Sequence, residues 1–487
     1  MDHSEAPVLE AVAAYRERGD VPFTPPGHKQ GRGTDPRVLD VLGEGVFRSD
    51  MLAIAGLDDR TSSHGVLERA QELMADAVRA EHTFFTTCGS SLSVKSAMLA
   101  VAGPHEKLLV GRDAHKSVIA GLIIAGIRPV WVEPNFDAEL HLAHAPSARA
   151  FRDAFDEHPD ARGALVTSPT PHGTCAELAA IAAVCHERGR PLVVDEAWGA
   201  HLPFHPDLPS WAMDAGADVC VTSVHKMGSG LEQGSVFHQQ GDLVDPAVLK
   251  ACADLLGTTS PSVLIYAALD GWRRQMAEDG RRLLGQALDL ARTTREAIED
   301  IDGLHVLHDE FLGDGRAAEL DPLQVIIDVS GLGATGYQVA DRMREHHHLN
   351  LHVSDHRRSS AQLTHADDEH TASLLVSALK DVAAQAATFE PAPSMTVPAP
   401  RDLRLEQACL PRDAFFGPVE QIPIADAAGR IVAEMLTPYP PGIPAALPGE
   451  RLNGEVLDYL RTGKAAGMVV PDAADTSLAT VRAVAEG

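Results

Sequence analysis

Short apolar runs alternate with amphipathic segments through the first half of the chain. The runs, several of them rich in β-branched residues, have the length of buried strands and lie at 83–87, 108–110, 129–132, 164–167, 191–194 and 219–224. Between them, helical periodicity is clearest at 94–101, 147–157 and 177–188. Repetition of strand, loop and helix implies right-handed crossovers and a mainly parallel sheet covered on both faces. We therefore predict an α/β fold.

The flanking segments follow other patterns. A helix is predicted at 6–18, after which Pro22, Pro25 and Pro26 break the helix and begin an extended arm. A helix is also predicted at 65–79, a return strand at 232–237, and further strands at 325–329 and 349–353.

Two of the predicted strands end on residues of opposite charge. The last run is followed by His225 and Lys226, and the run before it by Asp195. Pyridoxal phosphate (PLP) chemistry requires such a pair, because a lysine amine forms a Schiff base with the cofactor and a carboxylate keeps its pyridine nitrogen protonated. The alternative is a surface lysine and a helix-capping aspartate.

A third strand end offers a place for a phosphate. The run 83–87 leads into Cys88-Gly89-Ser90-Ser91 and then a helix, which places backbone N–H groups and hydroxyls at a helix N-terminus. Ordinary helix capping is the alternative. Open α/β sheets bind ligands at the carboxyl ends of their strands. The polar candidates at such ends are Ser90, His115, Ser168, Asp195, Ser223 and Lys226.

Two other patterns compete with this interpretation. Residues 331–336 fit GxGxxG between a strand and a helix, with Asp355 about twenty positions further on, as a dinucleotide site requires. Too few strand–helix repeats follow to complete a dinucleotide-binding fold. The histidines at 346–348, 352 and 356 suggest a metal site or a solvated helix end. We expect neither a nucleotide nor a metal.

Composition narrows the class of protein. The 487 residues predict roughly two to four domains, and 45% hydrophobic with 23% charged residues fits a soluble globular protein. No apolar stretch approaches the ~18 residues of a membrane helix and no signal-peptide pattern occurs, so we expect a cytoplasmic location. Six scattered cysteines indicate neither disulfides nor zinc. The net charge of −28 argues against nucleic acid or anionic membranes as partners, and is compatible with a cationic substrate.

Several collinear motifs together resemble one family, the bacterial Orn/Lys/Arg decarboxylases, from about residue 21 to 460. They are PPGHKQG at 25–31, GLDD at 56–59, CGSS at 88–91, DAHKSV at 113–118, SPTPHGT at 168–174, VVDEAWGAH at 193–201, TSVHK at 222–226 and TPYPPGIPAALPGE at 437–450. The resemblance implies PLP fold type I, similar to aspartate aminotransferase. It also implies an N-terminal arm (1–48), a major domain (49–305), a small α/β domain (306–390) and a C-terminal domain (391–487).

The resemblance also implies roles for individual residues. Lys226 would carry PLP, Asp195 would hold the pyridine nitrogen and His115 would stack on the ring. The residues expected to hold the phosphate are Ser90, Ser91, Ser223 and His225; Ser168 and Trp198 are further candidates at the cofactor, and the segment 258–260 is expected to reach a neighbouring subunit's phosphate.

The implied reaction is decarboxylation of arginine, lysine or ornithine to the amine and CO₂, associated with polyamine biosynthesis, by a homodimer or higher homo-oligomer. Ala53 and His352 fall where relatives are expected to have a glutamate, which leaves the choice of substrate open. A PLP-dependent transferase or lyase that releases no CO₂ is the alternative. A non-catalytic relative is disfavoured because both Lys226 and Asp195 are present.

Overall fold

The computed structural model describes residues 1–53, 57, 65–313, 315–391, 393–398, 400–439 and 442–486. Most of the GLDD motif, together with Pro440 and Pro441 of the C-terminal motif, lies outside these residues. The chain divides into two compact units. The first comprises residues 1–100 and 193–283, and the second comprises residues 101–192 and 284–487. The four domain boundaries expected from the sequence stay a prediction.

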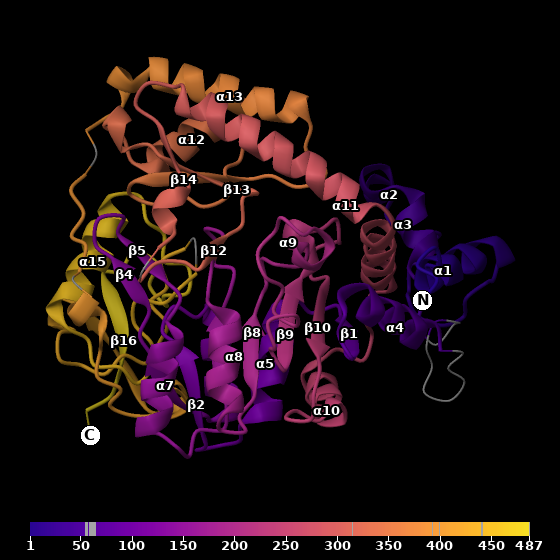
Figure 1. Ribbon diagram of the computed structural model, residues 1–487, viewed down its shortest axis with the longest axis horizontal. Helices are drawn as coiled ribbons and strands as arrows, with labels where there is room; N and C mark the ends of the chain where they lie inside the picture. Colours follow the sequence, from indigo (N-terminus) through magenta and orange to yellow (C-terminus); the bar gives the residue numbers. More distant parts are fainter. Residues whose placement is uncertain are drawn as a thin grey trace. The chain divides into compact units, whose positions relative to one another are not determined.

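A group of buried strands forms the centre of the first unit (Figure 1). In spatial order these strands are β1 (His82–Thr86), β10 (Ser235–Gln239), β9 (Val219–Ser223) and β8 (Leu192–Asp195). Strands β8 and β9 are parallel, whereas β10 runs antiparallel to both β9 and β1. The predicted return strand is confirmed with its start shifted to Ser235. Because β8 and β9 are parallel neighbours, their carboxyl ends, which precede Lys226 and include Asp195, lie at the same edge.

Helices complete the first unit. They are α1 (Pro7–Arg18), α2 (Pro36–Leu42), α3 (Glu44–Ser49), α4 (Val66–Val78), α5 (Ser90–Val101), α9 (Val224–Met227), α10 (Pro246–Leu256) and the first part of α11 (Val263–Glu299).

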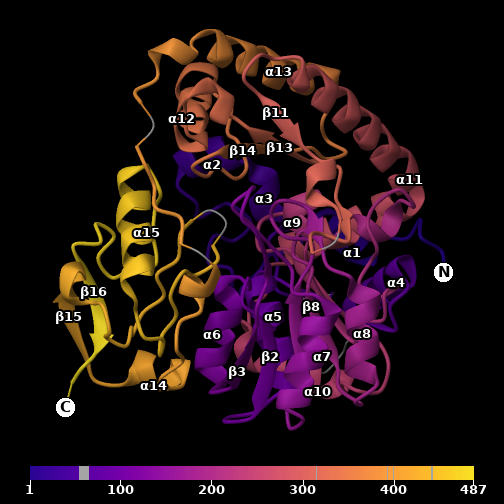
Figure 2. The same cartoon turned by 60° about the vertical axis from the view of Figure 1, so that its left-hand side comes forward.

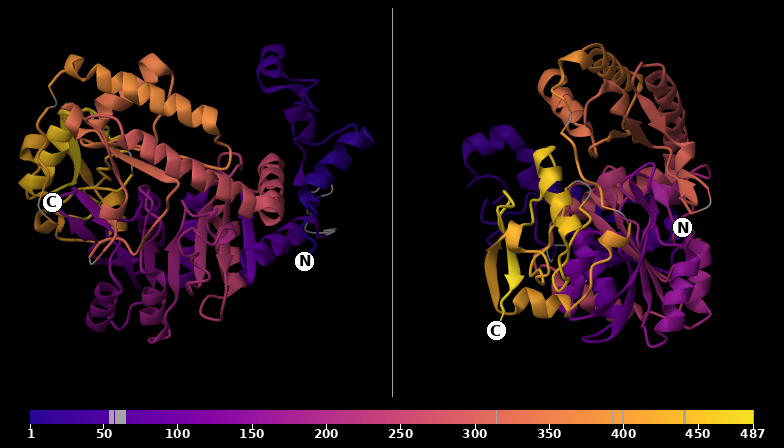
Figure 3. Two further views of the ribbon diagram at one scale, coloured as in Figure 1. Left: turned by 45° about the horizontal axis from the view of Figure 1, so that its top comes forward. Right: turned by 90° about the vertical axis from the view of Figure 1, so that its left-hand side faces the viewer.

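A buried ion pair between Arg273 and Asp270 of α11 anchors the N-terminus. Arg273 donates to the backbone oxygen of Glu5 (2.6 Å), and the Asp270 carboxylate accepts from the N–H of Val8 (2.8 Å). In the left view of Figure 3 the indigo segment with α2 and α3 extends away from the strands.

The second unit contains the parallel strands β6 (Ala164–Thr167), β2 (Lys107–Gly111) and β3 (Arg128–Val132). Two short antiparallel strand pairs also occur: β4 (Asn135–Asp137) pairs with β5 (Leu142–His144), and β7 (Thr174–Cys175) pairs with β12 (Glu319–Leu320). Three helices follow strands in the chain: α6 (Lys116–Ala125) follows β2, α7 (Ala148–Glu157) follows β5, and α8 (Leu178–His186) follows β7. The pattern of alternating strands and helices predicted for this part of the chain is confirmed.

A small antiparallel sheet belongs to the same unit. Its strands are β11 (His305–Leu307), β13 (Gln324–Asp328) and β14 (Arg358–Gln362); α12 (Gly336–His347) lies against β14 and against α13 (Glu369–Ala384) (Figure 2). The strand predicted at 349–353 is wrong, because β14 takes its place beside β13. Since β13 is antiparallel to both neighbours, the GxGxxG segment after it is not part of the parallel βαβ unit of a dinucleotide site.

The C-terminal part of the second unit has its own core. Its elements are α14 (Pro411–Phe416), β15 (Val419–Pro423), α15 (Gly454–Ala465) and β16 (Thr480–Val484), with β15 and β16 antiparallel. Val432, Leu436, Val456 and Leu460 are among its buried residues. None of the described helices of the chain combines the length and apolar character needed to cross a membrane.

Candidate active site

Lys226 lies on the short helix α9, directly after β9. Its Nζ is 3.9 Å from the centroid of the Trp198 ring, a cation–π contact that holds the amine in one place. Burial lowers the pKa of Lys226 to about 8, and the nearby charge of Asp195 opposes this shift. A lysine with a lowered pKa has more of its amine in the neutral, nucleophilic form at physiological pH.

Asp195 is the last residue of β8 and is 4% exposed. Burial raises the pKa of its carboxyl, whereas the charge of Lys226 and a bond from the N–H of Ala197 (3.3 Å) lower it. A buried carboxylate with a positive partner can hold a cationic N–H group, such as a protonated pyridine nitrogen. The predicted pair of Lys226 and Asp195 is therefore brought together in the first unit.

Two further segments of the first unit carry the candidate phosphate residues. Ser90 and Ser91 begin α5 after Gly89, whose φ of +75° is a left-handed conformation that glycine favours. The sequence predicted a helix from 94, so the helix begins one turn earlier than expected and includes both serines in its first turn. Ser223 ends β9 and is fully buried, yet its hydroxyl has no hydrogen-bond partner within the described part of the chain.

A hydroxyl network that the sequence did not suggest joins these segments. The hydroxyls of Ser93 on α5 and Ser235 on β10 are 3.0 Å apart, and the Ser235 hydroxyl donates to the backbone oxygen of Thr222 (2.7 Å), next to Ser223. The Nδ1–H of His225 donates to the backbone oxygen of Gly234 (3.2 Å), and burial lowers its pKa. The start of α5 and the end of β9 are thus fixed relative to each other.

These residues of the first unit fit PLP. The unpartnered Ser223 hydroxyl and the N-terminus of α5 suit a phosphate group, the Lys226 amine suits an aldehyde and Asp195 suits a pyridinium. Among these groups, the Ser223 hydroxyl has no hydrogen-bond partner in the described part of the chain.

His115 belongs to the second unit, where it caps the N-terminus of α6. Its Nδ1 accepts from the N–H of Ser117 (3.2 Å) and is 2.9 Å from the Ser117 hydroxyl, so Nε2 carries the proton of the neutral ring. Gly442 lies against the same ring, because a Cβ there would come within 3.1 Å of Cδ2 and Nε2. The backbone oxygen of Gly442 also accepts from the N–H of Lys116 (3.1 Å).

The remaining candidates occupy varied environments. The buried hydroxyl of Ser168 accepts from the N–H of Ala176 (3.0 Å), which gives it a structural task in the second unit. His352, also in the second unit, donates its backbone N–H to Ser360 (2.7 Å), and Ala53 of the first unit accepts from the N–H of Leu57 (2.9 Å). No group of three or more His, Cys, Asp or Glu side chains in the described ranges is arranged to hold a metal ion.

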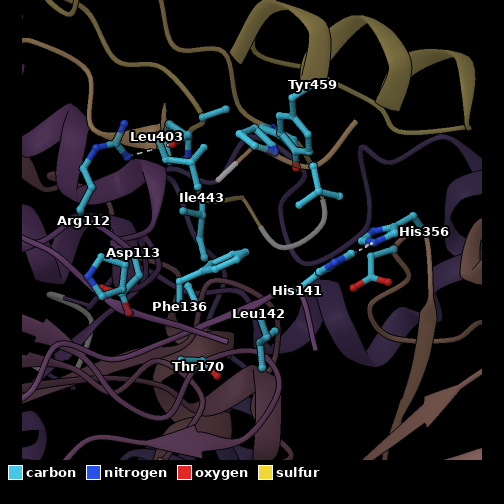
Figure 4. Close-up of a pocket in the computed structure, with 18 of the residues that line it drawn as sticks. Arg112, Asp113, Phe136, His141, Leu142, Thr170, His356, Leu403, Ile443 and Tyr459 are labelled. Atoms are coloured by element: carbon cyan, nitrogen blue, oxygen red, sulfur yellow. Dashed lines mark hydrogen bonds between the residues drawn. The ribbon is translucent and has the colours of Figure 1, made fainter. Parts of the chain in front are cut away.

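The second unit also contains a cavity of ≈ 260 Å³, shown in Figure 4. Its walls combine apolar side chains with Asp113, Arg358 and a pair of histidines, His141 and His356, whose Nδ1 and Nε2 are 3.1 Å apart. The sequence drew attention to DAHKSV only for His115. Burial of Asp113 is the tertiary feature that sequence reasoning missed.

Comparison with known proteins decides the family. The model of the Orn/Lys/Arg decarboxylase major domain matches residues 6–342, and that of the C-terminal domain of the same family matches residues 402–473. The chain belongs to the Orn/Lys/Arg decarboxylase family. This membership confirms the family resemblance, the expectation of a decarboxylase and the reaction class, decarboxylation of a basic amino acid.

Two curated relatives of this decarboxylase match over nearly their whole length. The arginine decarboxylase of Halalkalibacterium halodurans is 38% identical over 99% of this chain and 98% of its own, and that of Bacillus subtilis is 36% identical over 100% and 99%. The structure of the constitutive lysine decarboxylase of E. coli gives a TM-score of 0.82 at 22% identity, covering 99% of this chain and 82% of that chain. The fold expected from the sequence, PLP fold type I, is confirmed. The family is one of PLP-dependent enzymes.

Proposed function

We propose that this protein decarboxylates arginine with PLP bound at Lys226. The observation that carries the proposal is the arrangement of the first unit, in which a lysine with a pKa of about 8 faces the Trp198 ring and is influenced by the buried carboxylate of Asp195. Arginine is preferred among the basic amino acids because the two relatives reported above, both named arginine decarboxylases, align with the whole chain.

PLP, when bound, supplies an electron sink for the pair of electrons left at Cα when the carboxylate departs as CO₂. Lys226 would hold the cofactor covalently and then take part in moving the proton at Cα. With a pKa of about 8, roughly a tenth of its free amine is neutral at pH 7, compared with less than about a thousandth for an ordinary lysine. Trp198 keeps the amine oriented through its ring face.

Asp195 would keep the pyridine nitrogen protonated. For this task the carboxyl must be ionised when the cofactor is bound, and a pyridinium N–H would favour ionisation more strongly than the free site does. Because burial raises the pKa of free Asp195, the charged partner is required to offset the cost of burying the carboxylate.

The phosphate would be held by Ser90, Ser91, Ser223 and His225. The fully buried Ser223 hydroxyl gains a partner in this arrangement, and the N-terminus of α5 contributes backbone N–H groups and its dipole. His115, fixed by Ser117 and Gly442, would present the flat face of its imidazole to the cofactor ring, as the family resemblance implies. Ser168 would act indirectly, by holding the loop after β6.

A panel of amino acids tests the proposal. The purified protein with added PLP is expected to release CO₂ and agmatine from arginine, with lower kcat/KM for lysine and ornithine. Consumption of arginine without release of CO₂ and agmatine would favour a transferase or lyase on the same fold. Release of CO₂ only from neutral or acidic amino acids would contradict the basic substrate.

We further propose that the protein forms a homodimer. The apolar side chains of Phe23 (94% exposed) and Val41 (81% exposed) on the N-terminal arm support a contact surface between two subunits there. Light scattering coupled to gel filtration measures the mass in solution. The cytoplasmic location stays a prediction.

A further inference from the structure

Glu196 is a buried carboxyl directly after Asp195, and the proposed reaction gives it no role. The side chain is fully buried, as is that of Cys220 on β9. The Cys220 thiol donates to Oε2 of Glu196 (3.0 Å), and the N–H of Ala212 donates to the same oxygen (3.4 Å). Oε1 has no hydrogen-bond partner from another described residue. An acidic side chain in this position needs a physical reason, because burying a carboxylate is costly.

The partners of Glu196 identify it as a neutral acid. Neither a thiol nor a backbone N–H carries a charge, and Asp214, a charged residue that influences Glu196, is also negative. An ionised carboxyl would lack the positive partner that a buried charge requires. Burial accordingly raises the pKa of Glu196 well above its ordinary value, with Cys220 and Ala212 opposing the shift. Because both donors reach Oε2, that atom is the carbonyl oxygen and Oε1 carries the proton.

The side chain of Glu196 supports the turn that follows it. The N–H of Gly199 donates to the backbone oxygen of Glu196 (2.9 Å). A Cβ on Gly199 would overlap Cγ of Glu196 and come within 2.9 Å of its Cδ, so the turn packs directly on this side chain. Trp198, whose ring lies 3.9 Å from Nζ of Lys226, belongs to the turn. The position of the Trp198 ring therefore depends on the side chain beneath Gly199.

Glu196 is also tied to the strands of the first unit. Its N–H donates to the backbone oxygen of Val221 (2.9 Å), so the pairing of β8 with β9 continues one residue beyond Asp195. Together with the thiol of Cys220, two successive residues of β9 hold Glu196. A displacement of Glu196 would move Asp195 on one side and the turn on the other.

We propose that Glu196 is a positioning residue of the cofactor site, which as a neutral acid holds Asp195 and the turn containing Trp198 in place. Its neutrality matters because a second negative charge one residue away would raise the pKa of Asp195 and favour the protonated carboxyl. The inference rests on the proposed function, since it takes Lys226 and Asp195 as the residues that hold PLP.

Infrared spectroscopy of the cofactor-free protein tests the neutral acid. The difference spectrum between the wild-type protein and Glu196→Gln at pH 7 should contain the C=O stretching band of a protonated carboxyl, and the S–H band of Cys220 should shift. Glu72→Gln, at a 60% exposed side chain on α4, is the control and should remove carboxylate bands alone. Loss of carboxylate bands in Glu196→Gln would overturn the neutral acid.

Titration of Lys226 in the cofactor-free protein tests the positioning role. Brief acetylation at several pH values measures its midpoint, which burial places at about 8. Glu196→Ala removes the support of the turn and admits water, so the midpoint should rise by at least about 0.5 pH unit towards that of an ordinary lysine. Thr83→Val is the control, because it removes a buried hydrogen bond to His238 (2.8 Å) and should leave the midpoint unchanged.

Glu196→Gln separates shape from charge. The amide keeps the size and neutrality of the acid, so the midpoint of Lys226 should stay within about 0.2 pH unit of the wild-type value. An ionised Glu196 would stabilise the Lys226 ammonium, and its replacement by Gln would then lower the midpoint. A fall of about one pH unit would therefore overturn the proposal.

Turnover of the PLP-loaded protein gives a second measurement. Glu196→Ala should lower kcat by at least about tenfold, whereas Glu196→Gln should retain about half or more. Gly199→Ala displaces the turn from the other side, so it should also raise the Lys226 midpoint, and it replaces Glu196→Ala if that variant does not fold.

The two substitutions together test the packing itself. The methyl group of Gly199→Ala should lower kcat more in the wild-type protein than in Glu196→Ala, which makes room for it. Additive effects would overturn the direct support of the turn, and so would an unchanged midpoint in folded Glu196→Ala protein. The infrared and acetylation results do not depend on PLP or CO₂ release, so failure of this proposal is distinguishable from failure of the proposed function.

Discussion

Gly442 lies against the ring of His115 so closely that a Cβ on the glycine would come within 3.1 Å of both Cδ2 and Nε2. The φ of Gly442 is +90°, and its backbone oxygen accepts from the N–H of Lys116, the residue after the histidine. The Lys116 side chain is in turn 2.9 Å from Asp472. Residues from the C-terminal part of the chain therefore determine where the imidazole of His115 lies.

Gly442→Ala tests this relationship. The added methyl group should displace the imidazole, lower kcat by about tenfold or more and shift the visible absorption of the bound cofactor. Gly189→Ala is the matched control, because Gly189 has a φ of +61° and nothing within 4 Å of the position of its Cβ. Both variants should lose roughly 1 kcal/mol of stability from the backbone conformation alone. Equal activities in the two variants would contradict a positioning role for Gly442.

Lys226→Ala should abolish covalent attachment of PLP. In the wild-type protein, borohydride reduction followed by peptide mass spectrometry should find the cofactor on Lys226, because this amine is held at the Trp198 ring with a pKa of about 8. Lys250→Ala removes a lysine on α10 and should leave the labelling unchanged. Cofactor found on another lysine of the wild-type protein would show that the assignment is wrong.

Asp195→Asn should separate cofactor binding from activity. The phosphate contacts and Lys226 remain, so PLP should still bind, but turnover should fall by at least about a hundredfold because an amide does not hold the pyridine nitrogen protonated. Absorbance measures bound cofactor and CO₂ release measures turnover. Near-normal turnover with full occupancy would count against this role for Asp195.

The reactivity of Lys226 should rise at a lower pH than that of an ordinary lysine. In cofactor-free protein, burial lowers the pKa of its amine to about 8, so the neutral form grows through pH 8 rather than through about 10.4. Brief acetylation at several pH values, with free Nα-acetyl-lysine as internal reference, measures this midpoint by mass spectrometry. A midpoint equal to that of the reference would show that the buried environment has little effect on Lys226.

The chain order of the main elements could be predicted from local pattern. Strands β6, β8 and β9 each begin with three apolar residues and end at a polar residue, so their boundaries were predicted to within one residue and Asp195 and Ser223 were placed at strand ends. The collinear motifs then identified the family, because many short matches in order are far more specific than one. Lys226 and Asp195 were named from the same pattern.

One strand of the small sheet was predicted in the wrong segment because β14 is rich in polar residues. The segment 349–353 is more apolar than β14, whose sequence is RSSAQ, yet β14 forms the strand. Its hydroxyls are satisfied internally, since Ser359 donates to the backbone oxygen of Gly336 (2.9 Å) and Ser354 lies 3.0 Å from Ser359. A polar strand of this kind is stabilised by long-range hydrogen bonds that local periodicity does not report.

The sequence by itself determined the fold class, the family, and the lysine and aspartate proposed for PLP, because these depend on local apolar runs and on motifs. Tertiary structure alone decided that Ser93 and Ser235 join α5 to β9, that Gly442 packs on His115, and that the carboxyl of Asp113 is buried without a hydrogen-bond partner among the described residues. Each of these depends on residues distant in the chain meeting at short range. Their burial and hydrogen bonding are properties of the packed molecule, which no single segment encodes.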